Sequence, residues 1–248
     1  MKLLRVNLNP YFCGRLIDQT IIYNLKLNNK KYFGIKLKSL DKIILGSLFV
    51  SNLDKRRTFL DRLQERYQLD KKFFYPRIMQ LTEIGLIEKE KNNDDNYRLS
   101  FLGRETLKVV LVGGVFDILH PGHISTLKAA KSYGDLLIVV IATTSTAIKI
   151  KKNRKIYHSE ELRKELVSAL SFVDLALIGR EGTLFDTVEF VKPDIIALGY
   201  DQTHTEKYIS ENCKIRNIDT QVIRLNTPVP KSKSSKIKEE LGKAVYDI

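Results

Sequence analysis

His120 and His123 stand three residues apart, just after a short apolar run that ends in two glycines. The intervening Pro121 favours the first turn of a helix, where its missing N–H group costs nothing. Residues at this spacing lie on one face of a helix, so both imidazoles can reach the same point. A helix N-terminus also attracts anions through its unused N–H groups and its dipole. The pattern therefore predicts a phosphate-binding site.

Two other interpretations of the histidine pair stay open at this point. The two side chains could simply cap the helix. They could also ligate zinc, although no third ligand stands at a usual spacing. The sequence contains neither G-x-x-x-x-G-K-[ST] nor G-x-G-x-x-G. It therefore gives no support to a P-loop kinase or to a dinucleotide-dependent oxidoreductase.

The elements that must position the pair alternate between short apolar runs and amphipathic segments. The apolar runs of strand length are 109–112, 136–141, 173–178, 195–198 and 221–225. Near-continuous apolar runs are typical of parallel strands buried on both faces. Helix starts are indicated at Ser159 and at the capping-box pattern Thr203-x-x-Glu206, and a helix stop at Gly134. We expect an α/β domain with a doubly wound, parallel, five-stranded sheet, whose ligands bind at the carboxyl ends of the strands.

The residues around the histidine pair, Gly-Val-Phe-Asp-x-x-His-Pro-Gly-His, resemble the G-T-F-D-x-x-H-x-G-H signature of the cytidylyltransferase-like nucleotidyltransferases. Val115 replaces the threonine of that signature. The resemblance runs from about residue 109 to 241. Within the family, residues 192–202 are most similar to the archaeal-type FAD synthetases. The resemblance implies a Rossmann-like fold and transfer of a nucleoside monophosphate from a triphosphate to a phosphate monoester, with release of pyrophosphate.

The resemblance also implies which residues carry the reaction. His120 and His123 would contact the triphosphate as catalytic residues, and Arg163 would lie near the leaving pyrophosphate. The expected nucleotide-binding residues follow the strands and begin the last helix; they are Val115, Phe116, Asp117, Gly122, Lys152, Arg154, Gly199, Asp201, Ser234 and Ser235. The basic run 149–155 and Arg163 are also compatible with an ordinary solvated surface, and Gly199 with an ordinary turn. Asp117 is equally compatible with a structural aspartate beside the helix. Residues 230–235 depart from the richer motif that the family has there.

The resemblance makes FMN and ATP the expected substrates and FAD the expected product. A phosphate monoester is already ionised near neutral pH, so the site needs to align the reactants and stabilise charge rather than supply a base. One alternative is a cytidylyltransferase that uses CTP and a polyol phosphate such as glycerol 3-phosphate. Another is a regulator that senses a nucleotide or flavin without turnover and binds DNA. Mg²⁺ is expected as the counter-ion of the triphosphate, without a dedicated protein metal site.

Composition narrows the class of protein and shows where the charge lies. The chain has 248 residues, 43% of them hydrophobic and 29% charged, with a formal net charge of +13. It contains no apolar run long enough for a membrane span and no signal-peptide pattern, and its two cysteines are far apart. We therefore expect a cytoplasmic protein without a membrane partner. Residues 1–107 carry a net charge of +9 and residues 108–248 a net charge of +4.

Residues 1–107, the more basic part of the chain, differ from residues 108–248 in the pattern of predicted helices and strands. Residues 23–37 alternate like a β-hairpin, and helix-like segments follow at 40–50, 55–67 and 71–84, with Asp54 and Asp70 placed as N-caps and Gly85 as a stop. Strand-like residues 86–88 and 97–100 then flank a polar turn. This order resembles a winged helix-turn-helix domain. We expect a hairpin region over 1–38, a winged-helix-like domain over 39–107 and a nucleotidyltransferase domain over 108–248.

In the winged-helix interpretation, the segment 71–84 is the recognition helix. Its side chains available to phosphates and base edges are Lys71, Lys72, Tyr75, Arg77 and Gln80. The basic charge favours duplex DNA as a partner. The acidic wing, with Glu88, Glu90, Asp94 and Asp95, opposes it and favours a protein-contact module instead. The sequence leaves the oligomeric state open, with a homodimer among the alternatives.

Overall fold

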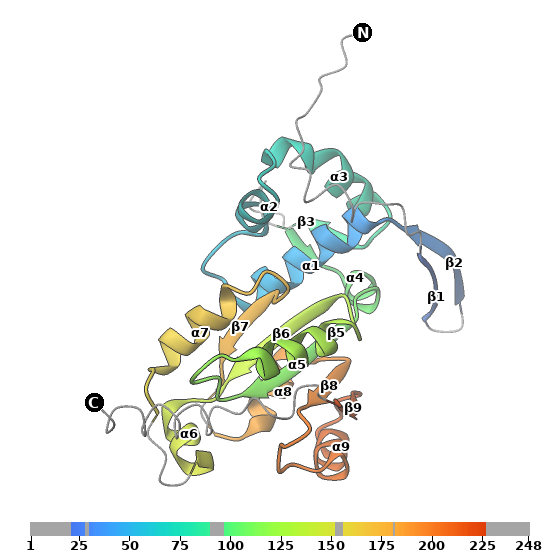
Figure 1. Ribbon diagram of the computed structural model, residues 1–248. Helices are drawn as coiled ribbons and strands as arrows, with labels where there is room; N and C mark the ends of the chain where they lie inside the picture. The colour runs from blue at the N-terminus through green and yellow to red at the C-terminus, as the bar shows by residue number, and fades with distance from the viewer. Residues whose placement is uncertain (1–20, 28–29, 90–96, 152–155, 181, 227–248) are drawn as a thin grey trace. The chain divides into compact units, whose positions relative to one another are not determined.

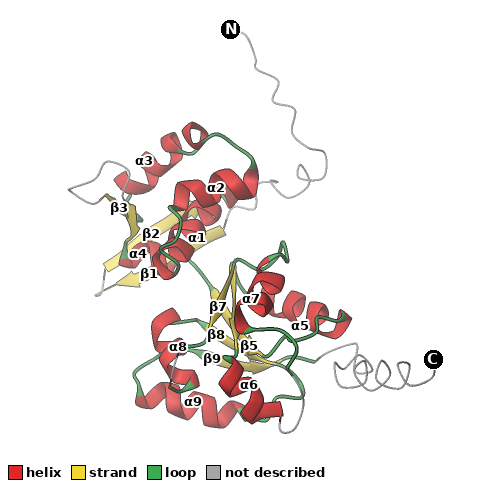
Figure 2. Cartoon of the chain, turned by 90° about the vertical axis from the view of Figure 1, so that its left-hand side faces the viewer, coloured by secondary structure: helices red, strands yellow, loops and turns green. Residues whose placement is uncertain are grey.

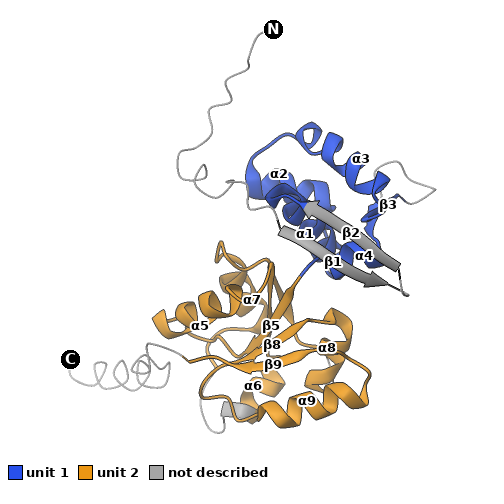
Figure 3. Ribbon diagram, turned by 90° about the vertical axis from the view of Figure 1, so that its right-hand side faces the viewer, with its two compact units in different colours: residues 1–107 blue, residues 108–248 orange. Residues whose placement is uncertain are grey.

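The computed structural model describes residues 21–27, 30–89, 97–151, 156–180 and 182–226 (Figure 1). The chain divides into two compact units, residues 1–107 and 108–248 (Figure 3). Several predicted residues lie outside the described ranges: Lys152, Arg154, Ser234 and Ser235 of the nucleotide site, and Glu90, Asp94 and Asp95 of the wing.

Unit 2 is built on a five-stranded parallel sheet with the strand order β7-β6-β5-β8-β9. The strands are β5 (Val109–Gly114), β6 (Leu136–Ile141), β7 (Leu175–Ile178), β8 (Ile195–Leu198) and β9 (Gln221–Arg224). Every residue of β6 and β8 is buried, as the continuous apolar runs predicted. The doubly wound α/β fold expected from the sequence is confirmed, with β6 and β8 at the predicted residues.

Helices cover both faces of this sheet, with α5 and α7 on one face and α8 and α9 on the other (Figure 2). Their bounds are α5 (Pro121–Lys131), α6 (Thr144–Lys151), α7 (Glu160–Ser168), α8 (Leu184–Val191) and α9 (Glu206–Ile215). The sheet buries Val110, Val139 and Ile195 together with Leu127 of α5 and Val167 of α7 in one apolar core. Burial of such side chains is the main free energy that holds the sheet and helices together.

The helix starts of unit 2 confirm one predicted cap and correct another. Ser159 caps α7, because its hydroxyl accepts a hydrogen bond from the backbone N–H of Leu162 at 3.3 Å. The predicted box from Thr203 to Glu206 is wrong. Thr205 caps α9 instead, accepting from the N–H of Tyr208 at 3.2 Å, and Glu206 is the first residue of that helix. Thr203 and Thr205 are both residues of a type that caps helices, and the helix is capped by Thr205.

Unit 1 contains two small antiparallel sheets and a group of short helices. Its elements are β1 (Ile21–Leu27), β2 (Lys30–Leu37), α1 (Ser39–Leu53), α2 (Phe59–Tyr67), the 3₁₀ turn η1 (Lys71–Phe73), α3 (Tyr75–Glu83), β3 (Ile87–Lys89), β4 (Tyr97–Leu99) and α4 (Phe101–Glu105). Ile44, Leu63 and Ile78, one from each of the three longer helices, have no exposed surface. The order of three helices followed by the β3–β4 hairpin is the one the winged-helix interpretation requires, and that interpretation stays a prediction.

The structure moves two predicted helix starts in unit 1. The predicted helix 71–84 is divided into the 3₁₀ turn η1 and the helix α3, which begins only at Tyr75. The segment 55–67 was expected to begin after Asp54, but α2 begins at Phe59 because Thr58 caps it, accepting from the N–H of Asp61 at 3.2 Å. The Asp54 carboxylate instead binds the guanidinium groups of Arg56 and Arg62, each at 2.7 Å. These two cations hold the pKa of Asp54 well below its usual value, although burial opposes them.

Two other boundary residues predicted for unit 1, Asp70 and Gly85, lie where the sequence placed them. Asp70 accepts from the N–H of Lys72 at 2.7 Å and so caps the turn that leads into α3. Gly85 follows α3 with φ of +80°, a backbone conformation that favours glycine. Across the described residues of both units, we find no helix with the length and apolar character of a membrane span.

Candidate active site

The two histidines of the sequence motif lie at the start of α5, where the carboxyl end of β5 leads into the helix. His120 precedes the helix with an extended backbone, and Pro121 occupies the first helical turn. The N–H of His123 donates to the carbonyl oxygen of His120 at 2.9 Å, which closes that turn. The two imidazole rings stack, with their centroids 3.9 Å apart and an interplanar angle of 27°. The predicted convergence of both side chains on one point is therefore present.

Phe116 supports this pair from the other side of the loop. Its backbone has φ of +51°, an uncommon conformation for a bulky residue, and its ring is buried. The ring meets that of His123 edge to face at a centroid distance of 5.2 Å. Gly114 makes room for this arrangement, because a Cβ atom there would lie 2.6 Å from the Phe116 ring. The glycine, the strained phenylalanine and the histidine therefore form one packed unit.

Asp117 is buried and anchors a distant segment rather than facing open space. One oxygen of its carboxylate accepts from the N–H groups of Tyr157 and His158, both at 3.0 Å. The Nδ1 atom of His158 lies 2.7 Å from the carbonyl oxygen of Asp117. These contacts tie the loop after β5 to the chain just before α7. Asp117 was expected either to bind nucleotide or to be a structural aspartate beside the helix, and its contacts are those of the structural alternative.

Arg163 was predicted to lie near the leaving pyrophosphate or, alternatively, on a solvated surface. The second alternative is wrong, because its side chain has no exposed surface in this structure. The guanidinium donates to the carbonyl oxygens of Val115 and Ala142, both at 2.8 Å, and to that of His158 at 3.1 Å. Burial lowers the pKa of this guanidinium, and nearby carboxylates, Asp117 first among them, oppose the shift. Arg163 is therefore a positioning residue that joins three loops at the edge of the sheet.

The loop after β6 is held to the same group of elements. The carboxylate of Glu160, at the start of α7, accepts from the backbone N–H of Thr144, the first residue of α6. This hydrogen bond lowers the pKa of Glu160. Lys149 is exposed near the end of α6, before the part of the basic run that lies outside the described residues.

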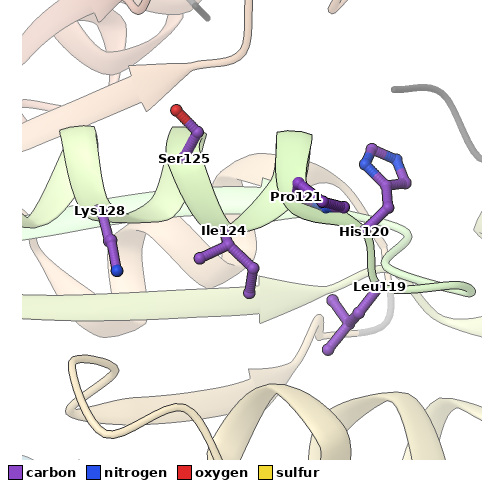
Figure 4. Close-up of a pocket in the computed structure, with 6 residues that line it drawn as sticks. All are labelled: Leu119, His120, Pro121, Ile124, Ser125 and Lys128. Carbon is purple, nitrogen blue, oxygen red and sulfur yellow. The ribbon is translucent and has the colours of Figure 1, made fainter. Parts of the chain in front are cut away.

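The first turn of α5 is accessible from outside. A hollow of about 600 Å³ lies beside it, lined by Leu119, His120, Pro121, Ile124, Ser125 and Lys128. Leu119, Ile124 and Lys128 point to one side of the helix, and His120 and Ser125 point to the other (Figure 4). Gly122 is buried within this turn. Among the described residues, His120 is the member of the histidine pair that lines this hollow.

The second predicted binding loop follows β8, the strand next to β5. Gly199 is buried, and Asp201 is exposed in the turn that follows. The side chain of Gln202 donates to the carbonyl oxygen of Gly113 at 2.6 Å, so this loop and the end of β5 are directly connected. The structure thus brings Gly199 near the loop that leads to the histidine pair.

Comparison with known proteins agrees with this geometry. The family described as Cytidylyltransferase-like matches residues 111–240, which is more than half of the chain. The chain belongs to the cytidylyltransferase-like family. The match begins within β5 and covers both the histidine motif and the loop after β8.

Relatives of this cytidylyltransferase-like protein include curated proteins named FAD synthase. The protein from Aciduliprofundum boonei is 47% identical over 116 residues, 47% of this chain and 76% of the relative. The protein from Picrophilus torridus is 45% identical over 126 residues, 51% of this chain and 89% of the relative. A solved structure, titled a lipopolysaccharide core biosynthesis protein from Thermoplasma volcanium, has 41% identity, covers 49% of this chain and 98% of its own, and has a TM-score of 0.47.

Within the described residues, the cytidylyltransferase-like site offers no ready-made cage for a cation. No three side chains of histidine, cysteine, aspartate or glutamate gather there in a way that could hold a metal ion. The nearest carboxylate to the histidine motif in sequence, Asp117, already accepts two backbone N–H groups.

The predicted nucleic-acid contacts of unit 1 are largely engaged within the unit. Lys71 lies 2.5 Å from a carboxylate oxygen of Asp61. Arg77 makes a two-point ion pair with Asp41, at 2.5 and 2.7 Å, and also donates to Gln80 at 2.6 Å. The other two predicted contacts differ in exposure, since Lys72 is exposed and Tyr75 is half-buried. Two of the three basic residues predicted to contact DNA, Lys71 and Arg77, are therefore ion-paired within unit 1.

Sequence reasoning did not single out three side chains that shape this site. Gln202 and Arg224 hold the loop after β8, and Glu160 holds the start of α6. Residues 192–202, which include Gln202, entered the sequence analysis only as the segment similar to the archaeal-type FAD synthetases. A polar residue at the end of the edge strand β9, as Arg224 is, was the remaining signal in the sequence.

Proposed function

We propose that this protein is an FMN adenylyltransferase, which forms FAD and pyrophosphate from FMN and ATP. The observation that carries the proposal is the stacked pair His120 and His123 at an accessible helix N-terminus, placed where β5 ends. Such a site favours a phosphate chain through N–H groups, the helix dipole and two imidazoles. The curated relatives named FAD synthase support FMN as the acceptor.

The proposed reaction needs alignment and charge stabilisation. An oxygen of the FMN phosphate attacks the α-phosphorus of ATP, the bond from that phosphorus to the bridging oxygen breaks, and pyrophosphate leaves with the electron pair. A phosphate monoester has a second pKa near 6 and is largely dianionic at pH 7, so no side chain has to remove a proton from it. His120 and His123 would donate hydrogen bonds to oxygens that gain charge in the transition state.

The remaining residues of the site would hold the histidine pair and the loop after β5 in position. Phe116 fixes the ring of His123, and Arg163 fixes the loop that contains Val115. We infer that the backbone amides of Val115 and Phe116 contact the phosphates, with Lys152, Arg154, Ser234 and Ser235 completing the site from outside the described residues. Mg²⁺ would bind the triphosphate oxygens and reduce their charge. A cytoplasmic location also stays a prediction.

The proposal is tested by offering the purified protein Mg²⁺ with each of four substrate pairs. The acceptors are FMN and glycerol 3-phosphate, the donors are ATP and CTP, and pyrophosphate release is followed. We expect release from FMN with ATP. Release only from CTP with glycerol 3-phosphate would establish the polyol-phosphate cytidylyltransferase instead. Tight nucleotide binding without turnover in any pair would favour a sensor that regulates through unit 1.

For unit 1, duplex DNA stays the predicted partner and a protein surface its alternative. The net charge of +9 over residues 1–107 supports DNA. The ion pairs of Lys71 and Arg77 reduce the number of cations on α3 and η1 that are available to phosphates. A homodimer is a further prediction, for which size-exclusion chromatography with light scattering is the direct measurement.

A further inference from the structure

Two side chains hold the loop after β8 in place. Gln202 belongs to the loop itself, and Arg224 is the last residue of the neighbouring strand β9. Together they bind backbone atoms of residues 199, 202 and 204.

The strand order places this loop at the point where the sheet changes direction. The chain builds β5, β6 and β7 outward on one side, and then returns to place β8 and β9 on the other side of β5. In doubly wound sheets, the loops at such a point leave the sheet in opposite directions and a crevice opens between them. In doubly wound sheets this crevice is where nucleotides bind.

The side chain of Gln202 spans the two strand ends that border this crevice. Its Nε2 atom donates to the carbonyl oxygen of Gly113 in β5 at 2.6 Å. Its Oε1 atom accepts from the N–H of Gly199, just after β8, at 3.2 Å. One amide therefore fixes the separation of the two loops at the point from which they diverge.

Arg224 fixes the rest of the loop through its carbonyl oxygens. Its Nη1 atom donates to the carbonyls of Gly199 and Gln202, at 2.9 and 3.1 Å, and its Nη2 atom donates to that of His204 at 2.6 Å. The carboxylate of Glu206 holds the guanidinium from behind, at 2.9 and 3.0 Å. These charged hydrogen bonds leave the backbone of the loop little freedom to adjust.

We propose that Gln202 and Arg224 are positioning residues that set the base selectivity of the nucleotide site. Adenine and cytosine both present an exocyclic amino group beside a ring nitrogen that accepts a hydrogen bond. The two bases differ in how far this edge lies from the ribose, because adenine has two rings and cytosine has one. A loop with a fixed backbone discriminates between the two bases by the distance of this edge from the ribose. A loop that is free to move would accommodate both bases.

This inference rests on the proposed function only in taking ATP as the preferred donor. It is tested by binding, with no acceptor present, so that a failure to make FAD is seen separately in the turnover assay. The dissociation constants of Mg²⁺-ATP and Mg²⁺-CTP are measured by titration calorimetry for the wild type, Gln202→Glu and Arg224→Lys. A glutamate at 202 keeps the size and the acceptor but cannot donate to Gly113, and a lysine at 224 cannot reach three carbonyls.

We expect the ratio of the two affinities to fall by about 10-fold or more in both variants, the scale on which shape alone discriminates ligands. The matched control is Glu211→Gln, which also removes a carboxylate ion pair from α9, the one with Lys207 at 3.8 Å, but at an exposed position. Its ratio should stay within about 2-fold of the wild type. Thermal unfolding of each variant shows that it is folded, and Gln202→Glu carries the test if Arg224→Lys does not fold.

Three results would overturn the proposal: a wild type that binds ATP and CTP equally, folded variants that keep the wild-type ratio, or an equal loss of affinity for both nucleotides. The last result would mean that the two residues only support the fold. A wild type that prefers CTP, and loses that preference in the same variants, would support the positioning roles while contradicting ATP as the donor.

Discussion

The guanidinium of Arg163 donates a hydrogen bond to the carbonyl oxygen of Val115 at 2.8 Å, although the two residues are 48 positions apart in the chain. Val115 lies in the loop between β5 and the histidine pair. The same guanidinium binds the carbonyls of Ala142 and His158, so one buried cation sets the relative positions of three loops. Its replacement should therefore affect both the fold and turnover.

Arg163→Lys should lower the stability of unit 2 and turnover together. Lysine has one ammonium group and cannot bind three carbonyls in the geometry of a guanidinium. Since hydrogen bonds to charged groups contribute roughly 1.5–3 kcal/mol each, we expect a loss of about 2–4 kcal/mol in the free energy of unfolding. Denaturant unfolding and kcat for FAD formation are the measurements, with Arg180→Lys as the exposed-arginine control. A large loss of kcat at unchanged stability would instead indicate direct contact with the pyrophosphate.

His123→Ala should reduce kcat by about 10²-fold or more, the scale of removing one transition-state hydrogen-bond donor. The measurement is steady-state pyrophosphate release with FMN and ATP. Tyr133→Ala is the control, because that ring is exposed just beyond the other end of α5. Turnover of the His123 variant close to that of the wild type would refute a catalytic role for this side chain.

Gly114→Ala should impair turnover, whereas Gly113→Ala should not. A Cβ atom at 114 would lie 2.6 Å from the Phe116 ring, and the ring would have to move and take the contact with His123 with it. A shift of about 1 Å in a catalytic group can cost on the order of 10²-fold in rate. At 113, the nearest atom to an added Cβ is 4.0 Å away. Equal kcat values for the two variants would contradict this account of Phe116.

Arg77→Leu should destabilise unit 1 by about 3–5 kcal/mol, because it leaves the fully buried carboxylate of Asp41 without its cation. Lys72→Ala, at an exposed position of the neighbouring turn, should change the free energy of unfolding by no more than about 0.5 kcal/mol. Both are measured by denaturant unfolding of the full chain. If Arg77→Leu unfolds like the wild type, its ion pair contributes little and the side chain is available to a ligand.

Duplex DNA should bind the full chain with an affinity that falls as salt rises, if phosphates are contacted. We expect a shallow slope of log K against log salt, because Lys71 and Arg77 are engaged by Asp61 and Asp41. Lys72→Ala should lower the slope by about one. The measurement is fluorescence anisotropy of a labelled duplex over a salt series. Absence of binding at low salt would make unit 1 a protein-contact module.

The parts of the structure that sequence reasoning predicted are those with a local signal. The apolar runs gave β6 and β8 to the residue, and Pro121 between two histidines gave the start of α5. Local signals failed where neighbours compete, as Thr205 does with Thr203 at the start of α9. The role of Arg163 was not predictable, because its carbonyl partners belong to segments that only the folded sheet brings together.

The same reason explains why Gln202 and Arg224 were missed. Their partners, Gly113 for Gln202 and Gly199 for Arg224, lie 89 and 25 positions away in the chain. Most of these partners are also backbone atoms, which have no signature in the sequence. Hydrogen bonds to backbone groups across a sheet edge are therefore found only when the strand order is known.

The contacts of Arg224 have a consequence for protein engineering. The guanidinium of Arg224 binds main-chain carbonyls of the loop. The backbone conformation of the loop therefore does not depend on which side chains occupy the exposed positions 201 and 203. Asp201 and Thr203 can therefore be randomised in a library while the backbone stays the same. New nucleotide preferences can therefore be selected by changing this loop alone, with the rest of the domain left as it is.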